Sequence, residues 1–228
     1  MPLPLVLWDI DHTLIDTRGV GRNLSSSAFE EVTGQPMRKQ AKIDGITEAV
    51  IFRETAKLHG LTTNRQDFER FAQALTDQHV QRAGELRERG HALPGAAAAL
   101  DALAAAGVEQ TVVTGNVLGV AEIKLAVFGL DTHILWSVGA YGEDADLRPD
   151  LVRLSLSRAS ITAEDAVLIG DTPADVEGGL KTGVRVIGVA TGRSTADDLR
   201  AAGAPVVLAD LTDTTGLVGL ITALGRTR

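Results

Sequence analysis

The chain has 228 residues, 44% of them hydrophobic, enough for one large domain or a domain with a smaller insertion. Its net charge of -8 argues against nucleic acid as a partner, and the absence of cysteine excludes disulfides and thiolate chemistry. Because we find neither a signal peptide nor the run of about 20 apolar residues that a membrane span needs, we expect a soluble, cytoplasmic protein.

The first apolar segment, LPLVLWD (3–9), predicts a buried strand. Residues from about 17 to 90 then contain no convincing strand and predict an all-helical insert. Three helices are expected there: NLSSSAFEEVTG (23–34), ITEAVIFRETAKLHG (46–60) and NRQDFERFAQALTDQHV (64–80). In the third, Asn64 is the expected N-cap with Asp67 three residues later, and one face carries Phe68, Phe71, Leu75 and His79.

The second half alternates apolar runs with helical stretches such as PGAAAALDALAAAG (94–107), which begins near Pro94 and stops at Gly107. Strands are expected at 108–115, 133–138, 166–171, 185–190 and 204–210. This alternation predicts an α/β fold with a doubly wound parallel sheet. We expect residues 1–16 and 91–228 to form this core, and residues 17–90 to form a helical cap over the sheet's carboxyl edge.

Polar residues follow three of the expected strands. The first ends in Asp9-Ile10-Asp11, a second in Thr114-Gly115-Asn116, and a later one in Asp171, with Asp175 four residues on. The carboxyl ends of parallel strands share one edge, so these groups are expected to converge. A cluster of carboxylates repels itself unless a hard divalent cation is present, which points to Mg²⁺.

Such a site suits phosphoryl transfer, which mainly demands positioning and charge neutralisation. One carboxylate can attack phosphorus to give an aspartyl-phosphate, and a second can protonate the leaving alcohol and then deprotonate water. Thr114 and the backbone N–H groups of Gly115 and Asn116 can hold phosphate oxygens. Asn116 is either such a contact or the N-cap of the next helix.

Three short motifs carry a family resemblance. DIDHT resembles the DxDxT signature of the haloacid dehalogenase superfamily, VVTGN its second motif, and GDTPAD its acidic fourth motif. Their order, with a helical insert between the first two, is similar to the phosphoglycolate-phosphatase-like branch. The resemblance implies Asp9 as nucleophile, Asp11 as general acid/base and Thr114 as a phosphoryl ligand. It also implies Mg²⁺ held by the Asp9 side chain, the Asp11 backbone carbonyl and Asp171, with Asp175 close by.

The third motif departs from the family pattern, which places a Lys before the fourth motif. Here Arg148 stands before Pro149, and its planar guanidinium is not equivalent to a compact ammonium. Lys124, on the helix after Thr114, is a rival cation. Either residue is a candidate for stabilising the phosphoryl group, and Arg148 is the first choice.

In the insert, Gly45, Thr47 and Glu48 fit a loop that reaches over the active site, and Lys42 and Arg53 are candidate contacts for an anionic substrate. His12 is given no catalytic role. The remaining histidines do not have metal-ligand spacing and are expected to pack or to lie at the surface. They are His59, His79, His91 and His133.

The favoured function is a Mg²⁺-dependent phosphatase of small phosphorylated metabolites, such as phosphoglycolate or a sugar phosphate. A phosphoglucomutase-like phosphoryl shuttle would use the same two aspartates, but His12-Thr13 replaces the Gly-Val common in the family's mutases, which favours hydrolysis. A phosphonate hydrolase would need a Schiff-base lysine, and Lys39, Lys42 and Lys57 have no distinctive context. An inactive ligand-binding relative is disfavoured because all the acidic residues are present. The sequence leaves the oligomeric state open.

Overall fold

The computed structural model describes residues 3–224 and is built around a parallel sheet of five strands. The strand order is β4-β1-β5-β6-β7, and every neighbouring pair is parallel. The strands are β1 (Leu5–Trp8), β4 (Gln110–Val112), β5 (Ala166–Gly170), β6 (Arg185–Val189) and β7 (Val206–Leu208). In this order, they confirm the strands expected at 3–9, 108–115, 166–171, 185–190 and 204–210.

Helices cover both faces of the sheet, which explains why β1 is apolar at every position. Val6 and Trp8 pack in one cluster with α5 (Ala96–Ala105) and α10 (Thr214–Leu224), whereas Leu5 and Leu7 pack in another with α7 (Arg148–Ala159). A smaller cluster joins β6 to α8 (Pro173–Thr182) and α9 (Ala196–Ala201). The predicted doubly wound α/β core is confirmed.

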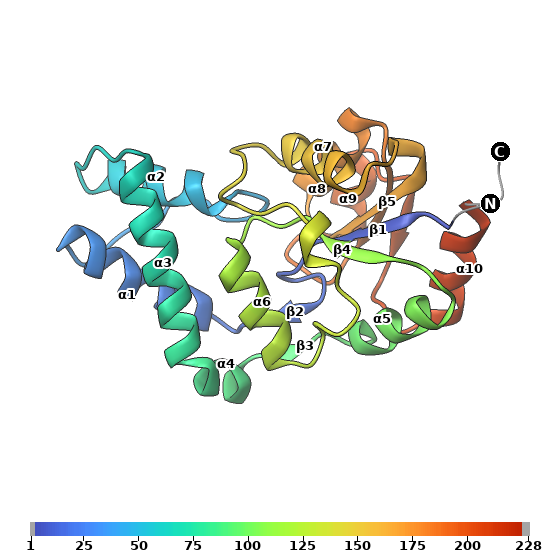
Figure 1. Ribbon diagram of the computed structural model, residues 1–228, viewed down its shortest axis with the longest axis horizontal. Helices are drawn as coiled ribbons and strands as arrows, with labels where there is room; N and C mark the ends of the chain where they lie inside the picture. The colour runs from blue at the N-terminus through green and yellow to red at the C-terminus, as the bar shows by residue number, and fades with distance from the viewer. Residues whose placement is uncertain (1–2, 225–228) are drawn as a thin grey trace.

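Four of the helices between β1 and β4 in the chain lie together at one end of the molecule (Figure 1). They are α1 (Val20–Thr33), α2 (Glu48–Leu58), α3 (Arg65–Gln81) and α4 (Ala83–Arg89). Their side chains form a hydrophobic cluster around Phe29, Phe52 and Phe71, joined by Val120 of α6 (Leu118–Val127). The insert therefore has its own buried centre, and α6 connects that centre to the core.

Two features of this region were not predicted. The short helix α4 follows α3 almost directly. In addition, β2 (Ile15–Asp16) and β3 (His91–Ala92) pair antiparallel, so the chain enters and leaves the helical region at one place.

The longest helix, α3, begins as predicted. The Asn64 side chain accepts a hydrogen bond from the Asp67 backbone N–H at 3.0 Å, and the Asp67 side chain accepts one from the Asn64 N–H at 2.9 Å. The face expected to be apolar is buried, including His79. Of the helices within residues 3–224, none is both long and apolar enough to cross a bilayer.

The strand expected at 133–138 is wrong. This stretch contains the 3-10 turn η1 (Trp136–Val138) and meets the edge of β4 only at isolated bridges, Ile134 with Gln110 and, further on, Ala140 with Val113. Of the residues 133–138 only Ile134 is buried, and Leu135 is 41% exposed. Its apolar residues Ile134, Trp136 and Val138 pack against the core without forming a full ladder.

Candidate active site

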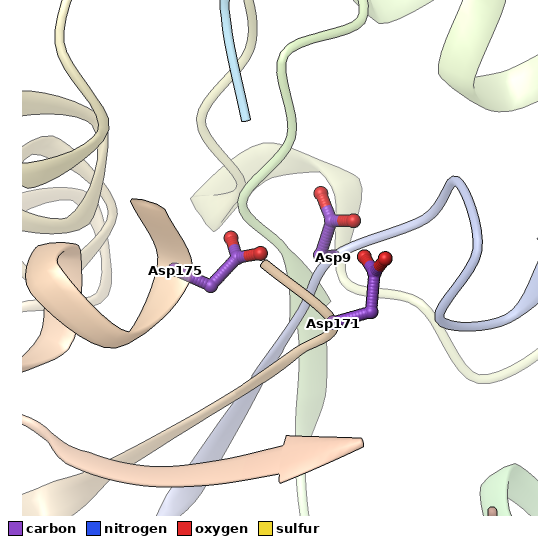
Figure 2. Close-up of side chains that lie close together, drawn as sticks. All are labelled: Asp9, Asp171 and Asp175. Atoms are coloured by element: carbon purple, nitrogen blue, oxygen red, sulfur yellow. The ribbon is translucent and has the colours of Figure 1, made fainter. Parts of the chain in front are cut away.

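Three carboxylates meet at the carboxyl edge of the sheet. Asp9 directly follows β1, Asp171 directly follows β5, and Asp175 lies in the first turn of α8 (Figure 2). Each offers one oxygen within 4.8 Å of the other two, and all three residues are buried. They converge because β1 and β5 are neighbouring parallel strands, as the sequence predicted for these three residues.

The cluster is short of positive charge. Burial, followed by the charge of Asp175, raises the pKa of Asp9 to about 8. Burial, followed by the charge of Asp9, raises the pKa of Asp171 to about 9. Arg148 opposes this, because its Nη2 lies 3.1 Å from Asp9 Oδ1 and its Nε lies 3.1 Å from Asp175 Oδ1. One guanidinium leaves most of the negative charge of three carboxylates uncompensated.

The geometry fits a small divalent cation. Although Arg148 Nε and Asp175 Oδ1 form an ion pair, they make no hydrogen bond with each other, and both are buried without a hydrogen-bond partner among the described residues. Gly192 lets the Asp171 carboxylate approach the backbone closely, since an added Cβ would overlap Asp171 Oδ2. Three buried oxygen donors with an unpartnered lone pair match the preference of Mg²⁺ for carboxylate ligands.

Asp11 is held away from this cluster by its own cation. Lys124 Nζ donates to both Asp11 carboxylate oxygens at 2.7 Å, and Asn116 Nδ2 donates to Asp11 Oδ2 at 2.7 Å. Burial raises the pKa of Asp11, but the Lys124 charge and hydrogen bonds outweigh it and the pKa is lowered. His12, between the two aspartates, has a left-handed φ of 62°. Asp9 and Asp11 therefore stand one residue apart with different partners.

The Thr114 turn completes this arrangement. Thr114 Oγ1 accepts hydrogen bonds from the Asn116 N–H at 3.2 Å and from Asn116 Nδ2 at 2.8 Å. Asn116 is not the N-cap of α6, because Val117 takes that place, so the N-cap alternative is wrong. Thr114, Gly115 and Asn116 all line the same cavity as Asp9 and Asp11.

The two rival cations both lie at the site. Arg148 is the first residue of α7, and besides Asp9 it donates to the Val113 carbonyl at 2.8 Å. Lys124 projects from α6 toward Asp11 and Asn116. Both side chains are buried and line the cavity, and Asp9 and Asp11 are paired with different cations.

The helical region supplies the opposite wall of this cavity, whose volume is about 850 Å³. Lys42, Gly45 and Glu48 line it, in line with the expected position of this loop. Thr47 instead donates a hydrogen bond to the Asp146 carbonyl at 3.4 Å. Arg53 is not among the lining residues described and pairs with Asp146 at 2.9 Å.

His79 also lines the cavity, whereas the sequence led us to expect only packing or surface exposure. It is 2% exposed and lies on the apolar face of α3, one turn after Leu75. A polar residue within an otherwise apolar helical stripe was the available signal. That signal alone does not distinguish a core histidine from one facing a cavity.

Comparisons with known proteins support the motifs. A family model described as haloacid dehalogenase-like hydrolase matches residues 6–189. A probable phosphatase, IndB, from Dickeya dadantii is 26% identical over 93% of this chain and 92% of that protein. A phosphoglycolate phosphatase from Rhodospirillum rubrum is 36% identical over 44% of this chain and 42% of that protein.

Among solved structures, a putative β-phosphoglucomutase from Bacteroides vulgatus superimposes with a TM-score of 0.67 at 19% identity, covering 97% of this chain and 90% of that one. At this identity the likeness supports the fold. Together with the family match, the phosphatase relatives confirm the predicted resemblance and the prediction of a phosphatase.

Proposed function

Because the chain belongs to the haloacid dehalogenase-like hydrolase family, we propose that it is a Mg²⁺-dependent phosphatase of small phosphorylated metabolites that works through an aspartyl-phosphate. The observation that carries this proposal is the separation of the two aspartates. Asp9 lies in a buried carboxylate cluster beside Arg148, whereas Asp11 is paired with Lys124. One carboxylate is thus placed to attack and the other to move protons.

In the first step, an Asp9 carboxylate oxygen attacks phosphorus and the bond from phosphorus to the leaving oxygen breaks. Asp11 gives its proton to that oxygen. Lys124 favours the ionised form of Asp11, but the negative charge of an arriving phosphoryl group raises the pKa of Asp11 and opposes this effect. In the second step, water attacks the aspartyl-phosphate, Asp11 accepts a proton from it, and phosphate leaves Asp9.

Asp9, Asp171 and Asp175 would hold Mg²⁺, with the Asp11 backbone carbonyl as the further ligand implied by the family resemblance. When bound, the ion supplies positive charge that lowers the pKa values of these carboxyl groups and polarises the phosphoryl oxygens. Arg148 adds charge on the side of Asp9. Thr114 and the backbone N–H groups of Gly115 and Asn116 are our candidates for holding the phosphoryl oxygens.

The helical region over the cavity excludes bulk water and large partners, which favours a small-molecule substrate. Water is the favoured acceptor because His12-Thr13 replaces the Gly-Val common in the family's mutases. A phosphoglucomutase-like shuttle would differ in accepting the phosphoryl group on a sugar hydroxyl. Phosphoglycolate, the substrate named for one relative, is one candidate. We also propose that residues 17–90 act as a cap on a core of 1–16 and 91–228, and that the enzyme works in the cytoplasm.

Phosphate release from p-nitrophenyl phosphate, measured with Mg²⁺ and with a chelator, tests this function. We expect Mg²⁺-dependent turnover, and a loss of at least about 1,000-fold in an Asp9→Asn variant that still unfolds cooperatively. Asp101→Asn is the matched control, since Asp101 is an exposed residue paired with His133. A folded wild-type protein without activity in either condition would contradict the proposal, as would an Asp9→Asn variant with wild-type turnover.

A further inference from the structure

In the helical wall of the cavity, two buried polar atoms have no hydrogen-bond partner among the described residues. They are His79 Nε2 and Glu48 Oε2. Both residues line the cavity that contains Asp11, and the charges of Asp11 and Lys124 act on both. Buried polar atoms are almost always hydrogen-bonded, so two orphans in one cavity mark a place where a bound molecule supplies the missing partners.

The hydrogen-bonding role of His79 is fixed by its own helix. Its Nδ1 lies 2.8 Å from the Leu75 carbonyl oxygen, which can only accept, so Nδ1 carries the hydrogen. Burial, followed by the charge of Lys124, lowers the pKa of His79 to about 4, which keeps the ring neutral near pH 7. Nε2 is therefore a bare acceptor that needs a donor from its ligand.

Glu48 is placed by the contact between the insert and the core. It is the first residue of α2. Its backbone N–H donates to the carbonyl of Gly115, the residue after Thr114, at 2.8 Å. Burial raises the pKa of its carboxyl group to about 7. The side chain can thus accept a hydrogen bond and, when protonated, donate one.

No buried cation is free to face a carboxylate at this place among the residues described. Lys124 donates to Asp11 and Asn116, and Arg148 donates to Asp9 and to a backbone carbonyl. The same cavity also contains the apolar residues Ile51, Leu75 and Val120. Hydrogen-bond acceptors next to apolar side chains suit a carbon chain that carries hydroxyl groups.

The cavity also has cations with exposed side chains. Arg22 and Lys42 are exposed, and Arg193 pairs with Asp44 at 3.4 Å. An ion pair between a ligand and an exposed side chain contributes little to binding. By contrast, leaving the buried atoms His79 Nε2 and Glu48 Oε2 without a hydrogen bond costs free energy. These two atoms therefore determine which leaving group binds best.

We propose that His79 and Glu48 bind hydroxyl groups of the leaving alcohol, and that the enzyme acts on polyol or sugar phosphates rather than on phosphorylated carboxylic acids. This inference rests on the proposed phosphatase function and makes His79 and Glu48 its specificity-determining residues. A hydroxyl group donates to His79 Nε2 and exchanges a hydrogen bond with Glu48. A carboxylate at the same place would meet an acceptor and an acidic side chain.

Three matched substrates test the proposal: glycerol 1-phosphate, propyl phosphate, which lacks both hydroxyl groups, and 3-phosphoglycerate, in which a carboxylate replaces the terminal hydroxymethyl group. A set of hexose phosphates extends the polyol arm. We expect kcat/KM for the best hydroxylated substrate to exceed that for propyl phosphate and 3-phosphoglycerate by roughly tenfold or more. A wild-type enzyme that prefers 3-phosphoglycerate or phosphoglycolate would overturn the proposal.

The variants then assign the preference to residues. His79→Leu and Glu48→Leu should each reduce the ratio of kcat/KM for glycerol 1-phosphate over propyl phosphate by about 3- to 10-fold, and His79→Gln, which keeps an acceptor, should restore part of it. His133→Leu, on the core surface, is the matched control. If the two residues had a purely structural role, the substitutions would lower kcat/KM for both substrates equally and leave the ratio unchanged. That result would also overturn the proposal.

Two outcomes distinguish a wrong substrate class from a wrong phosphatase function. Absence of p-nitrophenyl phosphate hydrolysis in the folded wild type would defeat the phosphatase function itself. Hydrolysis of p-nitrophenyl phosphate with no preference among the three matched substrates would defeat only the substrate class. If His79→Leu does not fold, the wild-type ranking and Glu48→Leu still decide the question.

Discussion

Asp9 and Asp11 are one residue apart, yet each contacts a different cation, and this assigns different consequences to removing Arg148 or Lys124. Arg148 lies 3.1 Å from the proposed nucleophile, so it can stabilise charge on the phosphoryl group. Lys124 lies 2.7 Å from Asp11, so it acts through the proton-transferring group. The two roles separate when the leaving group does not need a proton.

We expect Arg148→Met to lower kcat by about 100- to 1,000-fold on alkyl phosphates and on p-nitrophenyl phosphate alike. Lys124→Met should lower kcat by about 10- to 100-fold on alkyl phosphates but much less on p-nitrophenyl phosphate, because p-nitrophenolate leaves without being protonated. Steady-state kinetics on both substrates measure this, with melting temperatures as the folding check. The assignment of Arg148 would be wrong if only Lys124→Met slowed p-nitrophenyl phosphate.

The sequence was sufficient to predict that Asp9, Asp171 and Asp175 lie close together, because the carboxyl ends of parallel strands share one edge of the sheet regardless of the loop conformations. It was not sufficient for His79. That residue faces the cavity only because α3 packs beside α6, a contact between segments whose relative placement no local pattern encodes. The pairing of Lys124 with Asp11 rather than Asp9 likewise depends on which side of the turn α6 lies.

Among the elements, the loop between α1 and α2 closes the cavity through Gly45. Gly45 has a φ of +69°, and an added Cβ would overlap Ala174 at the start of α8. Gly60 has nearly the same backbone, with a φ of +72°, but nothing lies within 4 Å of an added Cβ. These two glycines separate backbone strain from the contact between insert and core.

Gly60→Ala should lower the free energy of unfolding by about 1 kcal/mol through the left-handed backbone alone. Gly45→Ala should lower it further and also reduce kcat/KM by roughly tenfold, because the loop cannot seat against α8 and Glu48 loses its position. Urea denaturation and kinetics on an alkyl phosphate measure the two effects. Equal stability and equal activity in both variants would show that the Gly45 contact does not hold the loop.

The elements also show where apolar composition misleads. The strands β1 and β5 are apolar because each faces helices on both sides, and such runs were correctly predicted. HILWSV (133–138) has a similar composition, but it lies outside β4 and buries little beyond Ile134. The pair of two-residue strands β2 and β3 was missed because so short a ladder has no periodicity to detect.

For the molecule as a whole, the carboxylate cluster links stability to pH. Asp9 and Asp171 have an ordinary pKa of 3.8 and folded values of about 8 and about 9. Between these limits the folded protein binds protons that the unfolded chain has released. Their contribution to stability is therefore complete below about pH 4 and is lost as pH rises toward 9, with a slope of at most about 1.4 kcal/mol per pH unit for each group.

Without Mg²⁺, the melting temperature should therefore fall more steeply between pH 6 and pH 9 in the wild type than in Asp171→Asn, which removes one of the two groups. Added Mg²⁺ should stabilise the wild type more at pH 8.5 than at pH 6, because binding needs ionised carboxylates and must displace protons at the lower pH. Asp101→Asn should follow the wild type in both respects. Thermal denaturation across this pH range, with and without Mg²⁺, measures these differences. If the melting temperatures of the wild type and Asp171→Asn change with pH at the same slope, the carboxylates are already ionised and the protein alone neutralises their charge.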